Sequence, residues 1–358
     1  MKLSRRNFIQ RSAALASVVA LPSIISSAIP SGKRQTFNGS VFKKNEKYDP
    51  NSVCRVEKSR GNGNICSNTV MAKDKLRVAT CQFNVTGDMM SNSGYIKKFI
   101  VEAANNKADI VHFSEASLSG YPPNDIPSFD NFDWESMVRE TNVIMSLAKK
   151  YNIWVILGSA HYLGKEDLPL NCLYIISNEG KLAGRYDKSM ITRIDASYYS
   201  AGNHIEVIDL KGYKLGFLIC YDSCYPEMYN LYRHKGVEIM FHSFYNAHFK
   251  GKTILDEVIP SEIRVRASDN RMWVIANNSS GYYSSWPTCI ARPDGSIESL
   301  ERGIPGILYR DFPDNDCSEK LRSWTHNFKM MKLPEDEVYQ VFGKPSNNKR
   351  ALDTKSIW

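Results

Sequence analysis

Residues 216–227 read Gly-Phe-Leu-Ile-Cys-Tyr-Asp-Ser-Cys-Tyr-Pro-Glu, an apolar run that stops abruptly at a cysteine. The run is typical of a buried strand, and the polar residues after it are typical of a turn. A thiol delivered by a strand end into a polar turn is well placed to act as a nucleophile. Since most cysteines at strand ends are small core residues, Cys220 indicates catalysis only if companions are present.

Two earlier segments supply such companions. Residues 113–122 read Phe-Ser-Glu-Ala-Ser-Leu-Ser-Gly-Tyr-Pro, and residues 184–188 read Gly-Arg-Tyr-Asp-Lys. In chain order, the three segments contribute the carboxylate of Glu115, the ammonium of Lys188 and the thiol of Cys220. A lone glutamate or lysine in such a place is usually a solvated surface residue, so the ordered set carries the argument.

With these motifs the chain resembles the nitrilase superfamily of carbon-nitrogen hydrolases, from about residue 75 to about residue 310. Further matches are Tyr-Tyr-Ser-Ala-Gly at 198–202, Val-Ile-Ala-Asn-Asn at 274–278 and Thr-Cys-Ile-Ala-Arg-Pro-Asp-Gly at 288–295. The resemblance implies an α/β fold, a four-layer αββα sandwich of two mixed sheets. It also implies a homodimer or a higher homo-oligomer in which sandwiches pair.

The alternation of strand-like and helix-like segments indicates an α/β layered domain without any resemblance. We expect strands at 76–83, 109–113, 153–158, 171–177, 181–186, 214–219, 238–242 and 273–276, and helices at about 93–106, 133–150, 226–235 and 257–270. Residues 178–180, Asn-Glu-Gly, are typical of a hairpin turn. Periodicity alone leaves a doubly wound sheet open, and the resemblance favours the sandwich.

The resemblance implies a role for each group of the triad. Cys220 would be the nucleophile, Glu115 would carry its proton to the departing amine, and Lys188 with the backbone N–H of Tyr221 would stabilise the oxyanion. Many relatives carry a second glutamate a few residues after the lysine, and here that position falls on Asp195. The resemblance implies a supporting role for it. Because its side chain is one methylene shorter, we expect a gap that a water fills, and we expect its removal to cost less activity than the loss of any triad residue.

The residues around the thiol narrow the substrate class. Cys-Tyr-Asp and Pro-Glu resemble the amidase and carbamoylase branches, whereas true nitrilases more often show Cys-Trp-Glu; amide or N-carbamoyl hydrolysis with release of ammonia or an amine is therefore favoured. Amidase-like relatives often place arginine and phenylalanine before Pro-Glu, but residues 223–225 are Ser-Cys-Tyr, so a basic contact to an acidic substrate is missing there. Aromatic candidates for the substrate pocket are Tyr121, Tyr225, Phe244, Tyr245 and Trp286.

Three other activities remain open: nitrile hydrolysis, acyl transfer by the same triad, and a catalytically silent binding homologue. Acyltransferases of this kind sit within a multi-span membrane domain, and the sequence offers no such spans beyond the leader. The intact set of Glu115, Lys188 and Cys220 argues against the silent homologue.

The first 28 residues have the features of a twin-arginine signal peptide. Residues 4–9 read Ser-Arg-Arg-Asn-Phe-Ile, a moderately apolar stretch covers 13–25, and 26–28, Ser-Ser-Ala, resembles a cleavage site. An amphipathic helix is the alternative, but the three features together favour export. We therefore expect a bacterial protein that meets the twin-arginine export machinery and is periplasmic or secreted.

Composition divides the remainder of the chain. Residues 29–74 form a polar basic linker, 75–311 the carbon-nitrogen hydrolase domain, and 312–358 a C-terminal arm that packs over its own domain or a neighbour, with disorder as the alternative. Residues 1–75 hold 14 Lys and Arg against 4 Asp and Glu, so the net charge of +8 lies there and residues 76–358 are slightly acidic. This distribution argues against nucleic acid as a partner.

The eight cysteines give no disulfide framework. Cys54 and Cys66 in the linker could pair after export or stay free, and Cys81, Cys172 and Cys289 are expected to be buried in apolar strands. Cys220 and Cys224 have no companion pair of Cys or His at metal-ligand spacing. We therefore expect no metal and no cofactor.

Overall fold

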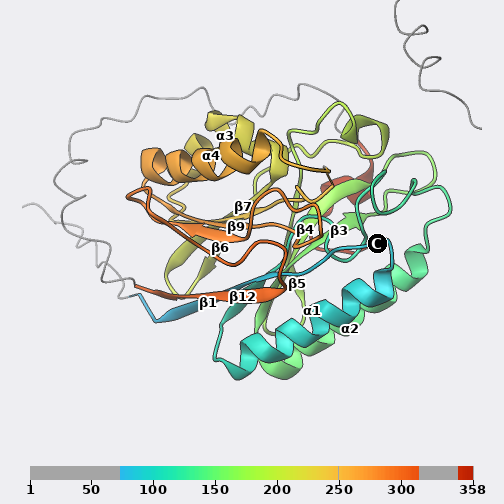
Figure 1. Cartoon of the computed structure of the whole chain (residues 1–358). Coiled ribbons are helices and arrows are strands. Elements are labelled where there is room, and N and C mark those ends of the chain that lie inside the picture. The colour runs from blue at the N-terminus through green and yellow to red at the C-terminus, as the bar shows by residue number, and fades with distance from the viewer. Residues whose placement is uncertain (1–72, 249, 314–345, 358) are drawn as a thin grey trace, which may run out of the picture. The chain divides into compact units, whose positions relative to one another are not determined.

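The computed structural model describes residues 73–248, 250–313 and 346–357, shown in Figure 1. The expected signal peptide 1–28, nearly all of the linker 29–74 and residues 314–345 of the C-terminal arm lie outside the described residues, and with them Cys54, Cys66 and Cys317. Every described residue belongs to one compact unit.

Twelve strands form two six-stranded sheets. The first sheet has the order β12-β1-β2-β3-β4-β5, with bounds β12 Gly306–Phe312, β1 Leu76–Gln82, β2 Ile110–His112, β3 Trp154–His161, β4 Leu170–Ile176 and β5 Leu182–Asp187. The second has the order β11-β10-β9-β8-β7-β6, with bounds β11 Ile297–Ser299, β10 Cys289–Ala291, β9 Trp273–Asn277, β8 Ile239–Ser243, β7 Tyr213–Ile219 and β6 Val207–Leu210. Each sheet is mixed, because a parallel centre (β1-β2-β3 or β7-β8-β9) continues into antiparallel strands.

Helices cover the outer face of each sheet. In Figure 1, α1 (Met89–Asn105) and α2 (Trp134–Tyr151) lie on one side of the sheets, and α3 (Pro226–His234) and α4 (Leu255–Asn270) lie on the other. The spacing of Ile96, Phe99, Ile100 and Ala103 gives α1 one apolar face, which is buried. The expected four-layer αββα sandwich is confirmed.

The core of the described residues has two large clusters, and β1 contributes to both. Leu76 and Val78 belong to the cluster that extends from between the sheets to α3 and α4, while Ala79 and Cys81 belong to the cluster under α1 and α2. Successive side chains of a strand point to opposite faces, so a strand covered on both sides buries apolar side chains on both. Cys81, Cys172 and Cys289 are buried as expected.

The largest differences from the expected elements lie at strand edges and helix starts. β6, β10, β11 and β12 were not expected; three are short or partly exposed edge segments with weak apolar patterning. Helix α1 begins at Met89 rather than near 93, because the Asp88 carboxylate accepts hydrogen bonds from the backbone N–H groups of Met90 and Ser91. The first sheet closes where β12 pairs with β1 in antiparallel register, Leu76 opposite Phe312.

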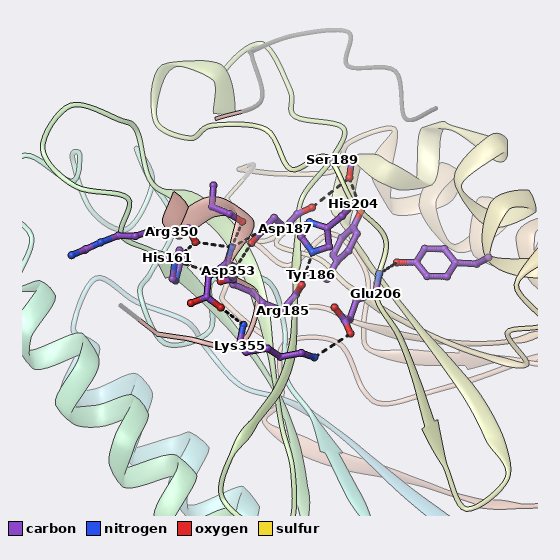
Figure 2. Close-up of polar contacts among 12 residues, drawn as sticks. His161, Arg185, Tyr186, Asp187, Ser189, His204, Glu206, Arg350, Asp353 and Lys355 are labelled. Carbon is purple, nitrogen blue, oxygen red and sulfur yellow. Dashed lines mark hydrogen bonds and ion pairs between the residues drawn. The ribbon is translucent and has the colours of Figure 1, made fainter. Parts of the chain in front are cut away.

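Residues 346–357 pack against the edge of the first sheet and close over Arg185 of β5, as Figure 2 shows. The guanidinium donates to the carbonyl oxygens of Arg350 (3.3 Å), Ala351 (2.7 Å) and Asp353 (2.9 Å), at the end of the short helix α6 (Lys349–Leu352). It also pairs with both oxygens of Asp187, at 2.8 and 3.0 Å. We call this set of contacts the Arg185 clamp; it places the end of the arm over its own domain.

Candidate active site

Glu115, Lys188 and Cys220 come together because each follows the carboxyl end of a strand. Glu115 follows β2 and Lys188 follows β5 in the first sheet, while Cys220 follows β7 in the second. Glu115 and Lys188 are both buried, and Lys188 Nζ lies 2.9 Å from Glu115 Oε1. The site therefore forms only where the two sheets face one another.

Two glycines allow the backbone to approach closely at this place. A Cβ on Gly158 of β3 would lie 1.9 Å from the carbonyl oxygen of Ser114, so glycine is required where the segment with Glu115 crosses β3. A Cβ on Gly202 would lie 2.2 Å from the carbonyl oxygen of Asp187, next to Lys188. Both glycines belong to the packing that sets the positions of the two charged groups.

Cys220 has an unusual backbone conformation. It is the first residue of a 3-10 helix, Cys220–Cys224, and has φ +45°, a left-handed value that side-chain-bearing residues rarely adopt. The buried Asp222 carboxylate holds the turn, since it accepts from the N–H of Ile219 and of Met190, both at 2.8 Å, and from the hydroxyl of Tyr186 at 2.7 Å. Burial raises the pKa of Asp222 to about 6 despite these bonds.

A histidine that belongs to none of the motifs also supports the turn. His242, buried in β8, lies with Nε2 3.2 Å from the carbonyl oxygen of Cys220 and with Nδ1 2.6 Å from the hydroxyl of Tyr229. Burial lowers the pKa of His242 well below its usual range, so the ring is neutral. A carbonyl oxygen only accepts, so Nε2 carries the hydrogen and Nδ1 accepts from Tyr229.

The electrostatics keep the thiol neutral and the lysine charged. Burial raises the pKa of the Cys220 thiol well above its usual range, and the Glu115 charge raises it further. Burial alone would lower the pKa of Lys188, but the carboxylates of Asp195 and Glu115 raise it well above its usual value. The resting site therefore holds an ammonium and an undissociated thiol.

Glu115 has one oxygen engaged and one available. Oε1 accepts from Lys188 and, at 2.7 Å, from the amide of Asn171, a residue that the motifs did not indicate. Oε2 is buried and has no hydrogen-bond partner among the described residues. Burial raises the pKa of Glu115; the Lys188 charge opposes this and the Asp195 charge adds to it. A carboxylate with a raised pKa and a free oxygen beside a thiol can accept a proton.

Asp195 reaches Lys188 directly, so the expectation of a gap that a water fills is wrong. Its Oδ2 lies 2.8 Å from Lys188 Nζ and accepts from the N–H of Thr192 at 3.0 Å, while Oδ1 accepts from the Tyr121 hydroxyl. The reason is local: Asp195 begins a 3-10 helix, Asp195–Ser197, that brings its backbone close to the lysine. These bonds and the Lys188 charge outweigh burial and lower the pKa of Asp195.

Cys220 opens into a cavity of about 460 Å³. Of the aromatic candidates, Tyr121, Phe244 and Tyr245 line it, and Tyr221 does so as well. Tyr225 and Trp286 are not in the lining. Tyr225 packs edge-on against Tyr221 with ring centroids 5.6 Å apart, and the buried Trp286 packs edge-on against Phe244 at 4.9 Å. An aromatic residue near a motif in sequence can thus lie behind the wall that it was expected to form.

In the part of the chain that the structure describes, no helix is long and apolar enough to cross a membrane.

The model of the carbon-nitrogen hydrolase family matches residues 77–319. The chain is 26% identical over 169 residues to 2-oxoglutaramate amidase from Bacillus subtilis (strain 168), a match that covers 47% of this chain and 64% of that protein. It is 25% identical over 267 residues to chloroplastic omega-amidase from Arabidopsis thaliana, with 70% of each chain covered.

Among solved structures, an amidase from Nesterenkonia sp. superposes with a TM-score of 0.60 at 19% identity, over 72% of this chain and 99% of that one. A variant of the amidase from Nesterenkonia sp. AN1 carries the acetamide moiety of fluoroacetamide covalently at its active site cysteine; it superposes with a TM-score of 0.60 at 19% identity, over 70% and 95% of the two chains. These likenesses establish the fold.

Proposed function

The chain belongs to the carbon-nitrogen hydrolase family, in its amidase branch, and we propose that it hydrolyses a non-peptide amide or N-carbamoyl bond through a thioester on Cys220. One observation carries the proposal. The thiol of Cys220 opens into the cavity and is kept neutral by burial, and the buried pair of Glu115, with its free oxygen, and Lys188 lies close enough to act on the pKa of that thiol. A neutral thiol needs a base within reach, and a thiolate attacking a carbonyl needs a cation for the oxyanion.

In the first step, the sulfur of Cys220 attacks the carbonyl carbon of the substrate while Glu115 Oε2 takes the thiol proton. The oxygen of the carbonyl becomes an oxyanion. Lys188 Nζ stabilises it, and so does the N–H of Tyr221, which lies in the first turn of the 3-10 helix Cys220–Cys224, where an amide has no acceptor within its own helix.

In the second step, the tetrahedral intermediate collapses. The protonated Glu115 gives its proton to the nitrogen, the carbon-nitrogen bond breaks, and ammonia or an amine leaves with that proton. A thioester between the acyl group and Cys220 remains.

In the last step, water hydrolyses the thioester. Glu115, again a carboxylate, takes a proton from the water as it attacks the thioester carbon. The carbon-sulfur bond breaks, the acid is released, and the proton returns to the sulfur.

Asp195 has a supporting role in this scheme. Lys188 lies between two carboxylates, so it remains an ammonium while Glu115 gains and loses a proton. Asp195 also ties the cavity wall to the charged cluster through the Tyr121 hydroxyl. Its contribution is to hold the cation in place, and it has no contact with the reacting atoms in the scheme.

Ammonia release from a panel of amides, N-carbamoyl amines and nitriles tests the proposal. We expect turnover of amides or N-carbamoyl amines and none with Cys220→Ala. Glu115→Gln should accumulate less of the acyl-enzyme that mass spectrometry detects on Cys220. Faster hydrolysis of nitriles than of amides, or amide hydrolysis that survives Cys220→Ala, would contradict it.

We also propose export and self-association, which rest on the sequence and the family resemblance. Arg5 and Arg6 support the twin-arginine route to the periplasm or cell exterior. Fractionation of cells with the wild type and with Arg5→Lys/Arg6→Lys tests this route: only the wild type should leave the cytoplasm, and equal distribution would exclude it. Light scattering on the purified chain tests the homo-oligomer, and a monomeric mass would exclude it.

A further inference from the structure

The cavity at Cys220 contains no charged side chain in its wall. None of the described residues that line it is Lys, Arg, Asp or Glu. Its polar groups are neutral amides, hydroxyls and thiols, including Asn124, Thr192 and Asn246. Burial lowers the pKa of His248, the histidine in this lining, so its ring is neutral at pH 7.

The buried charged cluster next to Cys220 offers no spare positive charge either. Lys188 is buried and already pairs with two carboxylates, Glu115 at 2.9 Å and Asp195 at 2.8 Å. The cluster therefore carries no net positive charge, and it repels a substrate anion once Glu115 is ionised. An ionised carboxylate that enters such a cavity loses its water without gaining a cationic partner, which costs several kcal/mol.

The segment 223–225 is where a cation would be expected if the substrate were acidic, and the structure shows what stands there instead. Ser223 and Cys224 both line the cavity. Burial and the Glu262 charge raise the pKa of Cys224, which keeps that thiol neutral. Arg266 lies behind this wall and is engaged there, since its guanidinium donates to the carbonyl oxygen of Ser223 at 3.1 and 3.2 Å.

The remaining lining is apolar and partly aromatic. Tyr121 and Tyr245 stack with ring centroids 4.8 Å apart and an interplanar angle of 16°. Phe244, Ile194 and Ile259 add further apolar surface. Apolar substrate surface that packs against such a wall stabilises the complex by about 25 cal/mol per Å² removed from water.

We propose that the substrate is an uncharged amide whose acyl group is apolar or aromatic and carries no carboxylate. This inference rests on the proposed amidase function and adds the substrate class to it. It separates the chain from an enzyme for a carboxylate-bearing amide such as 2-oxoglutaramate.

A matched pair of substrates tests the inference: succinamate, which has a free carboxylate, and its methyl ester, which has the same acyl chain without the charge. We expect kcat/KM to be at least about 100-fold higher for the ester, and phenylacetamide to be hydrolysed faster than succinamate. Binding of the same pair to Cys220→Ala, measured by calorimetry, gives the preference without turnover.

A charge-introducing variant tests the cause. Cys224→Arg places a cation in the wall of the cavity. The ratio of kcat/KM for the ester to kcat/KM for succinamate should fall at least about tenfold in this variant. Cys224→Gln adds length without charge and should leave the ratio between the two substrates near that of the wild type. If the ratio of kcat/KM values fell in both variants, the size of the side chain and not its charge would set the preference, and the inference would be overturned.

Failure of this inference and failure of the proposed function would give different results. If the wild type hydrolyses succinamate or 2-oxoglutaramate faster than the neutral amides, the inference is overturned and the amidase function stands. If neither an amide nor an N-carbamoyl amine is hydrolysed, the proposed function fails, while the binding preference of Cys220→Ala still decides between a neutral and an anionic ligand.

Discussion

Replacing Asp195 by asparagine removes one charge from the buried cluster while keeping the shape of the side chain. The carboxylate accepts from Lys188 at 2.8 Å, from Thr192 N–H at 3.0 Å and from the Tyr121 hydroxyl. The asparagine amide keeps one oxygen as an acceptor, but its NH2 group replaces the other oxygen and is a donor that faces another donor. Breaking a buried pair in this way costs about 3–5 kcal/mol, and we expect a loss of that size in the free energy of unfolding.

The same change should move the pH profile in a defined direction. The Asp195 charge is one of the causes that raise the pKa of Glu115. With asparagine this cause is removed, the pKa of Glu115 falls, and the carboxylate stays ionised to lower pH. Since Glu115 must be ionised to accept the thiol proton, the acid limb of kcat/KM should shift to lower pH. At the pH optimum, kcat should fall about 100-fold, which corresponds to about 2.7 kcal/mol, because Lys188 is no longer held on both sides.

The assays are urea unfolding and kcat/KM as a function of pH on the best amide, with Asp195→Glu as the control that keeps the charge. The control should keep the acid limb of the wild type but lose about 1–3 kcal/mol of stability, because Asp195 is fully buried and an added methylene has no free space. An acid limb that stays in place or moves to higher pH in Asp195→Asn would refute the reasoning, as would wild-type stability.

The remaining predictions concern the nucleophile, its support and acid stability. Cys220→Ala should retain less than about one part in a thousand of kcat/KM, with an unfolding curve close to the wild type, and Glu115→Gln should be nearly as damaging; higher residual turnover would mean that another residue starts the reaction. His242→Phe removes the N–H that reaches the carbonyl of Cys220 and should lower kcat about tenfold with little change in KM; slower alkylation of Cys220 by iodoacetamide is the accompanying sign, and an unchanged alkylation rate would exclude a positioning role. Burial lowers the pKa of His112 and of His161 to about 3, so the stability that these neutral rings contribute is present above about pH 6.5 and falls as the pH drops, by about 1.4 kcal/mol per pH unit for each. Urea unfolding at pH 7.5, 6 and 5 should show this slope, and His161→Gln should reduce it; a slope unaffected by that variant would contradict the assignment.

The alternation of elements predicted an α/β layered domain, and the family resemblance was needed to predict the four-layer sandwich. Cys220 could be located from an apolar run that stops at a thiol, whereas Glu115 and Lys188 could be located only from the order of the three motifs. The contact between Asp195 and Lys188 could not be obtained from spacing, because it depends on a 3-10 helix whose backbone brings a shorter side chain within 2.8 Å.

Three other features had no signal in the sequence. His242 lies in an apolar strand, where a lone histidine is ordinarily a core residue, and its contact with Cys220 depends on the register of β7 and β8. Tyr225 and Trp286 are close to the motifs in the chain, but the rotation of the turn and the packing on Tyr221 and Phe244 place them away from the cavity. Short strands such as β10 and β11 have too few residues for a periodic pattern.

The Arg185 clamp has a consequence for the order of events in folding. Arg185 and Asp353 are 168 residues apart, so the guanidinium of β5 receives its last carbonyl partners from a segment that leaves the ribosome long after the strand itself. Until then its N–H groups must be hydrated, and the edge of the sheet that leads into Lys188 stays open to water. We therefore expect pulsed hydrogen exchange during refolding to protect the amides of β7 and β8 before those of β5; simultaneous protection would mean that the edge forms without the clamp.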